Sequence, residues 1–82
     1  MTREARDEML ALTVLRQLCA SGEARRIRLA LGLSLTEIAD AVSADTSTIH
    51  RWERGQRAPR RSARALAYAD LLGRLLALEG RR

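Results

Sequence analysis

The sequence predicts an all-α fold of five helices in a single domain. Its 82 residues suffice for one domain, which would bury roughly 60–65% of its unfolded surface. Fourteen Ala and fourteen Leu, with no Phe and only two aromatic residues, favour a core of aliphatic side chains carried on helices. We find no segment in which polar and apolar residues alternate as they do in a strand.

The first helix is expected over residues 2–20, where no Gly or Pro occurs. Glu4, Asp7 and Glu8 lie near its start, where the helix dipole favours negative charge. Its apolar residues cover more of the circumference than one core needs. They form two arcs, one of Ala5, Met9, Leu12, Leu15 and Cys19 and one of Leu10, Val14 and Leu18. Either the helix is wedged between neighbours, or its surplus face meets another subunit.

The second helix is expected after Ser21, which can cap it, and before Gly32, which can end it in a left-handed turn. Its apolar face holds Ala24, Ile27 and Leu31. A short third helix follows over about residues 35–42. Ser34 caps it, and Glu37 three residues later completes a capping box. Its buried positions are Ile38, Ala39 and Val42.

A fourth helix over residues 46–54 follows a tight link at Ser43 and Ala44, with Asp45 as its natural cap. Ile49 and Trp52 are its large apolar residues, and we expect it to bury these two. Its other side chains, rich in hydroxyl, imidazole and guanidinium groups, are then left for polar contacts.

The fifth helix is expected to begin at Ser62, after Gly55 ends the fourth helix and Pro59 interrupts the basic loop QRAPRR. Apolar residues cover about half of its circumference. They are Ala65, Ala69, Leu72 and Leu76 on one side, and Tyr68, Leu71, Leu75 and Leu78 beside them. Gly73 can bend or divide this helix.

Charge is concentrated in the second half of the chain. Residues 1–20 and 21–43 each carry three Arg and three acidic residues, so both segments are neutral. Residues 44–82 carry nine Arg against four acidic residues, and therefore the whole net charge of +5. An anionic partner would dock there.

Residues 38–52 form a helix-turn-helix pattern, because apolar positions on two short helices are joined by a turn of three or four residues. Over residues 28–59, with the skeleton GLS..EIA...S...STI.RWE.G.R.P, the chain resembles the phage Cro and repressor type of helix-turn-helix regulators, also called xenobiotic-response-element-like. The resemblance implies a lambda-repressor-like core. Residues 1–20 would then be an extra helix for packing or dimerisation, and residues 21–82 the DNA-binding domain.

The resemblance also implies a structural salt bridge, because an Arg four residues before the Gly pairs in this family with the Glu that ends the recognition helix. Here these are Arg28 and Glu53. Two positions depart from the family pattern. Leu35 stands where the family usually has a Gln that holds a DNA phosphate, so that contact is not carried over. Ser43 stands where the family's turn usually has Gly, at a cost of roughly 1 kcal/mol if φ stays positive.

The fourth helix supplies the residues expected to contact DNA, because an α-helix fits the major groove and can bring polar groups to base edges. The residues expected to read bases are Thr46, Ser47, His50 and Arg51. Those expected to bind phosphates are Ser34, Thr36, Thr48, Arg54, Arg57, Arg60 and Arg61. The alternative is an ordinary solvated helix start and charged face, with His50 an exposed histidine.

These features predict a sequence-specific DNA-binding regulator of transcription, of repressor type, that binds double-stranded DNA as a homodimer. The alternative is a protein-interaction module, such as an antitoxin or regulator-binding protein, that uses the apolar terminal helices. One His, one Cys and no Lys provide neither a nucleophile with its base nor a metal site, so we expect no enzyme, cofactor or metal. With no leader or membrane span and a lone Cys19, we expect a cytoplasmic protein.

Overall fold

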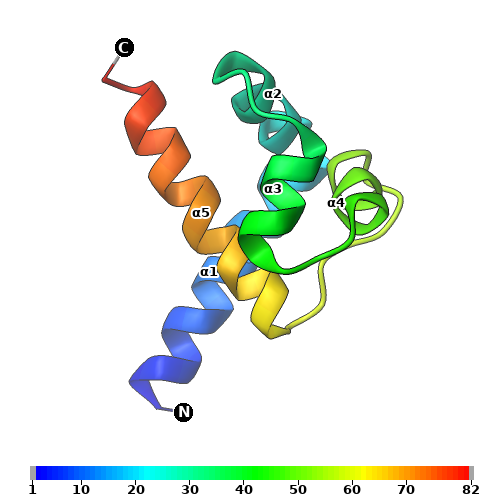
Figure 1. Cartoon of the computed structure of the whole chain (residues 1–82). Helices are drawn as coiled ribbons and strands as arrows, with labels where there is room; N and C mark the ends of the chain where they lie inside the picture. The colour runs from blue at the N-terminus through cyan, green and yellow to red at the C-terminus, as the bar shows by residue number, and fades with distance from the viewer. Residues whose placement is uncertain (1, 82) are drawn as a thin grey trace.

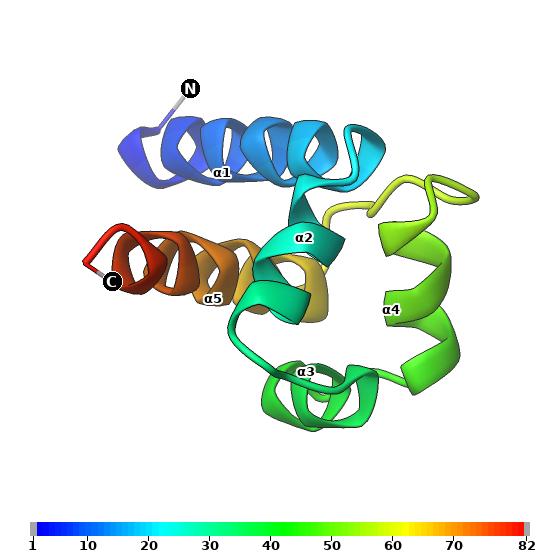
Figure 2. The same cartoon turned by 90° about the horizontal axis from the view of Figure 1, so that it is seen from above.

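The computed structural model describes residues 2–81 and folds them into five helices without a strand, which confirms the predicted all-α class. The helices are α1 (Arg3–Ala20), α2 (Glu23–Ala30), α3 (Leu35–Val42), α4 (Thr46–Glu53) and α5 (Ala63–Glu79). The long helices α1 and α5 cross and pack against each other, while α3 and α4 form a corner on the other side of α2 (Figures 1 and 2). No helix of this part of the chain is long and apolar enough to cross a membrane.

The local signals for helix ends operate largely as expected. Ser34 and Glu37 form the capping box of α3, and the Ser62 hydroxyl accepts a hydrogen bond of 3.1 Å from Ala65 N at the start of α5. Gly32 and Gly55 adopt positive φ after α2 and α4. The helix α5 runs through Gly73 without a break.

Three details of the helix ends differ from the sequence-based expectation. The N-cap of α2 is Gly22 with φ of 85°, because Ser21 is still the C-terminal cap of α1. Asp45 occupies the N-cap of α4, but its carboxylate accepts no capping hydrogen bond. The helix α4 ends at Glu53, so Arg54 is its C-cap instead of its last residue.

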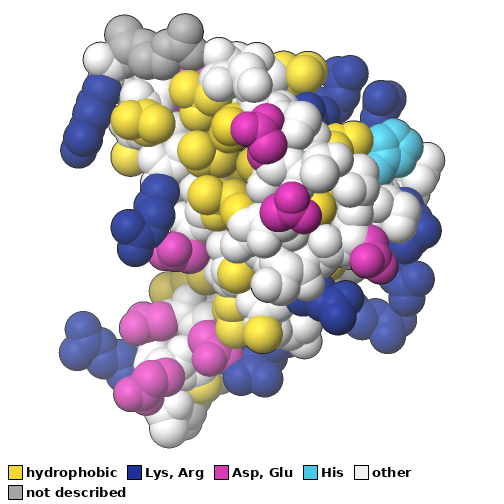
Figure 3. Space-filling model, in the orientation of Figure 1, with side chains coloured by type: hydrophobic (Ala, Val, Ile, Leu, Met, Phe, Trp, Pro, Cys, Tyr) yellow, Lys and Arg dark blue, Asp and Glu magenta, His cyan; other side chains and the backbone are white. Residues whose placement is uncertain are grey.

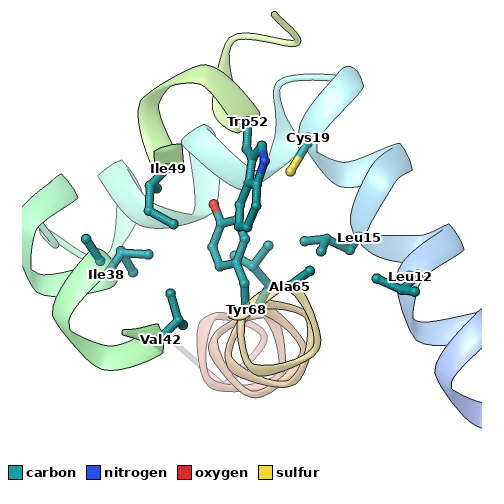
Figure 4. Packing of buried hydrophobic residues seen from close by; sticks show 12 residues of the cluster. Leu12, Leu15, Cys19, Ile38, Val42, Ile49, Trp52, Ala65 and Tyr68 are labelled. Carbon is teal, nitrogen blue, oxygen red and sulfur yellow. The ribbon is translucent and has the colours of Figure 1, made fainter. Parts of the chain in front are cut away.

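The core is aliphatic apart from one aromatic pair, in which the Trp52 ring stacks on Tyr68 with 5.7 Å between ring centroids (Figure 4). All five helices contribute to it, with Leu12, Leu15, Cys19, Ala24, Ile27, Ile38, Ala39, Val42, Ile49, Trp52, Ala65, Tyr68 and Leu72. Burial, with a smaller contribution from the charge of Glu53, raises the pKa of the Cys19 thiol to about 12. Cys19 is thus a small buried hydrophobe, as its position on the apolar stripe predicted.

The wide apolar faces of the terminal helices are only partly used by the core. On α1, Met9, Leu10 and Val14 are 49%, 61% and 53% exposed. The first turns of α1 extend past the other helices, which explains why Ala5 and Met9 are exposed although they share an arc with Leu12 (Figure 1). Both Tyr68 and Leu76 belong to the apolar stripe expected on α5, but Tyr68 is buried whereas Leu76 is 43% exposed.

Candidate nucleic-acid interface

The outward face of α4 is polar along its whole length. Ser47, His50, Arg51 and Arg54 recur at intervals of three and four residues and are all exposed. They lie opposite the buried Ile49 and Trp52, which attach the helix to the core. Of the remaining residues expected to contact DNA from this helix, Thr46 is exposed and Thr48 is partly buried. The helix therefore presents hydroxyl, imidazole and guanidinium groups side by side.

A buried ion pair holds the last turn of α4 against α2. Arg28 Nε and Nη2 donate to the two carboxylate oxygens of Glu53 at 2.7 and 3.0 Å, and Nη1 donates to the Leu33 carbonyl at 2.9 Å. The Arg28 and Glu53 side chains are 10% and 1% exposed. The hydrogen bonds to Glu53 raise the pKa of Arg28 above its ordinary value. The structure thus brings together the two residues that the family resemblance paired, and it places them beneath the polar face.

An open groove of about 470 Å³ lies between α4 and the start of α5. Its polar lining comes from both sides and from the loop that joins the two helices: Thr48, Arg51, Arg57, Arg60, Ser62 and Arg64. This groove, called the arginine groove below, gathers residues expected to read bases and residues expected to bind phosphates. The guanidinium groups favour an anion, and their planar fork suits the oxygens of a phosphate.

Four residues of the expected phosphate-binding set lie outside the arginine groove: Ser34 and Thr36 at the start of α3, and Arg54 and Arg61. Arg54 is exposed at the end of α4 and does not line the arginine groove. Arg61 is directed to α1, where its Nε donates to a Glu8 carboxylate oxygen at 2.8 Å. Because that carboxylate partly neutralises it, Arg61 offers less charge to a phosphate than its loop neighbours.

The start of α3 adds a second polar edge. Glu37 N donates to Ser34 Oγ at 3.0 Å, and Ser34 N donates to Glu37 Oε1 at 2.9 Å. The hydrogen bond from the Ser34 backbone, with a smaller contribution from the Ser34 side chain, lowers the pKa of the Glu37 carboxyl. Ser34 and Thr36 are exposed there. Leu35 is partly buried against the core, so its side chain packs inward at the position where the resembling family has a polar contact.

Basic side chains gather along the edge of the molecule formed by α4 and its following loop, at the right of Figure 3. Nine of the fifteen Arg lie in residues 44–82, and the chain carries a net charge of +5. Six of these nine Arg lie between residues 51 and 64, beside the exposed face of α4 and the arginine groove. Within residues 2–81, no group of three His, Cys, Asp or Glu side chains could hold a metal ion.

Arg64 and Arg16 also contribute to this side of the molecule, and only Arg64 had a signal in the sequence. Arg64 lines the arginine groove although it lies in the first turn of α5. Its place in the basic run from residue 57 to 64 was a usable signal. Arg16 Nε donates to the Pro59 carbonyl at 2.9 Å, which joins α1 to the basic loop across 43 positions. No local pattern marks such a contact.

Comparison with known proteins gives one finding. A family model described as a helix-turn-helix domain matches residues 13–79. The match includes α2 to α5 and the second half of α1, and so the whole face described above. No curated protein and no solved structure matches the chain.

Proposed function

Since the chain belongs to the helix-turn-helix domain family, whose members place a recognition helix in DNA, we propose that it is a sequence-specific DNA-binding regulator of transcription. It acts as a repressor of Cro type by occupying an operator, and it has no catalytic role. The observation that carries this proposal is the exposed polar face of α4 directly beside the arginine groove.

The exposed face of α4 is proposed to read bases in the major groove. That groove is about 12 Å wide and admits one α-helix. Arg51 is the strongest reader, because a guanidinium can donate to both acceptors of a guanine and contribute about 1–3 kcal/mol of discrimination. Thr46, Ser47 and His50 add hydroxyl and imidazole contacts to base edges. The Arg28–Glu53 pair and the Trp52 stack support this role by fixing the helix from below.

The arginine groove is proposed to bind the phosphate backbone beside the reading helix. Arg57 and Arg60 are its main contacts, with Thr48 on the helix side. Ser34 and Thr36 would contact a phosphate at the start of α3, and Arg54 would approach the backbone from the end of α4. Each phosphate that is neutralised adds about 0.9 to the slope of log affinity against log salt.

The regulator is proposed to act as a homodimer on an inverted repeat. The exposed apolar residues of α1 and α5 support it: Met9, Leu10, Val14, Leu76 and Leu78 are each more than 40% exposed. The same residues support the second candidate, a protein-interaction module that docks a different protein on these faces. Sedimentation of the purified chain at micromolar concentration, with and without operator DNA, separates the two.

Selection from a random duplex library tests the main proposal. We expect the purified chain to enrich an inverted repeat with half-site centres about 10 bp, or a multiple of it, apart. A bound fraction without enrichment would contradict sequence-specific recognition.

Alanine variants then assign the roles. We expect Ser47→Ala and Arg51→Ala to weaken binding to the selected site more than to random DNA, and Arg57→Ala and Arg60→Ala to weaken both alike. The matched control is Arg74→Ala, which removes an exposed guanidinium from the second half of α5. That half of the helix leads away from α4 (Figure 1). Equal losses on both DNAs for all four variants would show that α4 does not read sequence.

A further inference from the structure

The loop between α4 and α5 has few ties of its own. Gly55 N and Gln56 N donate to the carbonyls of Trp52 and Arg51 at 3.2 and 3.0 Å, which closes the end of α4. Among the described residues, no backbone–backbone hydrogen bond involves residues 57–61. Yet this stretch carries Arg57 and Arg60, two of the side chains that line the arginine groove. Something outside the loop must fix its position if these side chains are to be aligned before DNA arrives.

The helix α1 supplies two such ties. Arg16 Nε donates to the Pro59 carbonyl at 2.9 Å, and Glu8 accepts from Arg61 Nε at 2.8 Å. Glu8 and Arg16 are eight residues apart on α1, which separates their Cα atoms by about 12 Å along the helix axis. Two separated ties restrict both the position and the rotation of the loop. Figure 2 shows the loop passing beside α1 on its way to α5.

The ties also explain how the loop divides its arginines. Pro59 is fully buried, and its carbonyl is held by α1. Its neighbour Arg60 and the earlier Arg57 line the arginine groove, while Arg61 is drawn to α1 instead. The two ties thus set which arginines are directed to the groove.

We propose that α1 positions the phosphate-binding loop, with Arg16 and Glu8 as positioning residues. Arg61 then links the loop to α1 instead of contacting a phosphate. The inference rests on the proposed function, because it concerns the same DNA-binding side. It assigns to α1 a part in DNA affinity that needs no contact between α1 and DNA.

Binding of a fixed-sequence duplex, measured by fluorescence anisotropy over a series of salt concentrations, tests the inference on the full chain. We expect Arg16→Gln to weaken binding about tenfold, and its matched control Arg6→Gln, which removes an exposed guanidinium from the same helix, to weaken it much less. Thermal unfolding followed by circular dichroism verifies that each variant is folded. Equal losses for Arg16→Gln and Arg6→Gln would overturn the role of Arg16.

Glu8→Gln gives the sharper test, because charge and positioning predict opposite signs. Removing a negative charge from a DNA-binding protein strengthens binding if only the net charge matters. We expect Glu8→Gln to weaken binding severalfold, while Glu4→Gln, at an exposed position on the same helix, leaves it equal or slightly tighter. If Glu8→Gln binds more tightly and its salt slope is steeper by about 0.9, Arg61 has been released to contact a phosphate. That result overturns the role of Arg61 as a link between the loop and α1.

The slope of log affinity against log salt shows directly whether Arg61 links the loop to α1 or contacts a phosphate. We expect Arg57→Gln to lower the slope by about 0.9 and Arg61→Gln to leave it nearly unchanged while affinity falls. A slope lowered equally by both variants would make Arg61 a phosphate contact and overturn its assignment. If the unchanged protein shows no salt-dependent binding to duplex DNA, the proposed function fails and this inference with it. If the unchanged protein binds DNA in a salt-dependent way but the Arg16, Glu8 and Arg61 variants bind as it does, only the positioning role is overturned.

Discussion

Replacing Glu53 by Ala should destabilise the protein more than any exposed charge change. The Glu53 carboxylate is 1% exposed and accepts two hydrogen bonds from Arg28, at 2.7 and 3.0 Å. Its removal leaves a guanidinium that is 10% exposed with the Leu33 carbonyl as partner. A charge that stays in a buried site without its counterion is costly, because it has lost water as well as its ion partner.

The size of the loss follows from this burial. Breaking a fully buried ion pair by removing one partner costs about 3–5 kcal/mol. Because Arg28 retains some exposure, its guanidinium can move toward water, so we expect the lower end, about 3 kcal/mol of unfolding free energy. A domain of this length has a stability of about 4–12 kcal/mol. The melting temperature should then fall by about 12–24 °C.

Urea unfolding followed by circular dichroism measures this loss. The matched control is Asp70→Ala, which removes one partner of the exposed Asp70–Arg74 pair at 2.9 Å and should cost less than about 0.5 kcal/mol. The double variant Arg28→Met, Glu53→Leu should recover most of the loss, because it leaves no unpaired charge. The reasoning would be refuted if Glu53→Ala cost no more than Asp70→Ala.

Three further expectations concern stability. Ser43→Gly should raise the free energy of unfolding by about 0.5–1 kcal/mol, because Ser43 has φ of 58° in the left-handed region. The midpoint of urea unfolding should rise accordingly, and an unchanged or lower midpoint would contradict this. Ser62→Ala should lower the free energy of unfolding by about 1 kcal/mol, because the Ser62 hydroxyl caps α5. Asp45→Ala should lower it clearly less, because the Asp45 carboxylate makes no capping hydrogen bond. Equal losses for the two variants in urea unfolding would show that side-chain capping does not distinguish the two positions. Burial raises the pKa of Cys19 from 9.0 to about 12, so the folded chain holds the thiol proton more tightly than the unfolded chain. The stability that this provides is complete below pH 9 and is lost between about pH 9 and 12. The free energy of unfolding, measured at a series of pH values over that range, should therefore decline less steeply in Cys19→Ala than in the unchanged protein. Equal slopes for the two proteins would contradict this role of Cys19.

Local sequence was sufficient for the helices and their ends where short-range chemistry decides them. The Ser34–Glu37 capping box, the positive φ of Gly32 and Gly55 and the opening of α5 at Ser62 each depend on residues within four positions of one another. The apolar spacing of α3 and α4 likewise identified Ile38, Ala39, Val42, Ile49 and Trp52 as buried residues, because helical periodicity alone determines which side chains share a face.

The candidate DNA-binding side could be predicted in part. The polar face of α4 followed from the two apolar positions that attach it, and the basic loop from its Arg content. The pairing of Arg28 with Glu53 came from family resemblance, since charge patterns allow many pairs across 25 positions. Thr46, Ser47, His50 and Arg51 remain proposals as base readers until DNA binding is measured.

Tertiary packing decided what periodicity left open. A helix with apolar residues over half its circumference can bury any of several faces. In α5 the buried face is the one that stacks Tyr68 on the Trp52 ring, and Leu76 is left exposed beyond the core. Contacts over 43 and 53 positions directed Arg16 to Pro59 and Arg61 to Glu8. These ties depend on where α1 crosses the other helices. Backbone propensity and capping act within a few residues, whereas the division of the arginines between the groove and α1 arises only when distant helices are packed together.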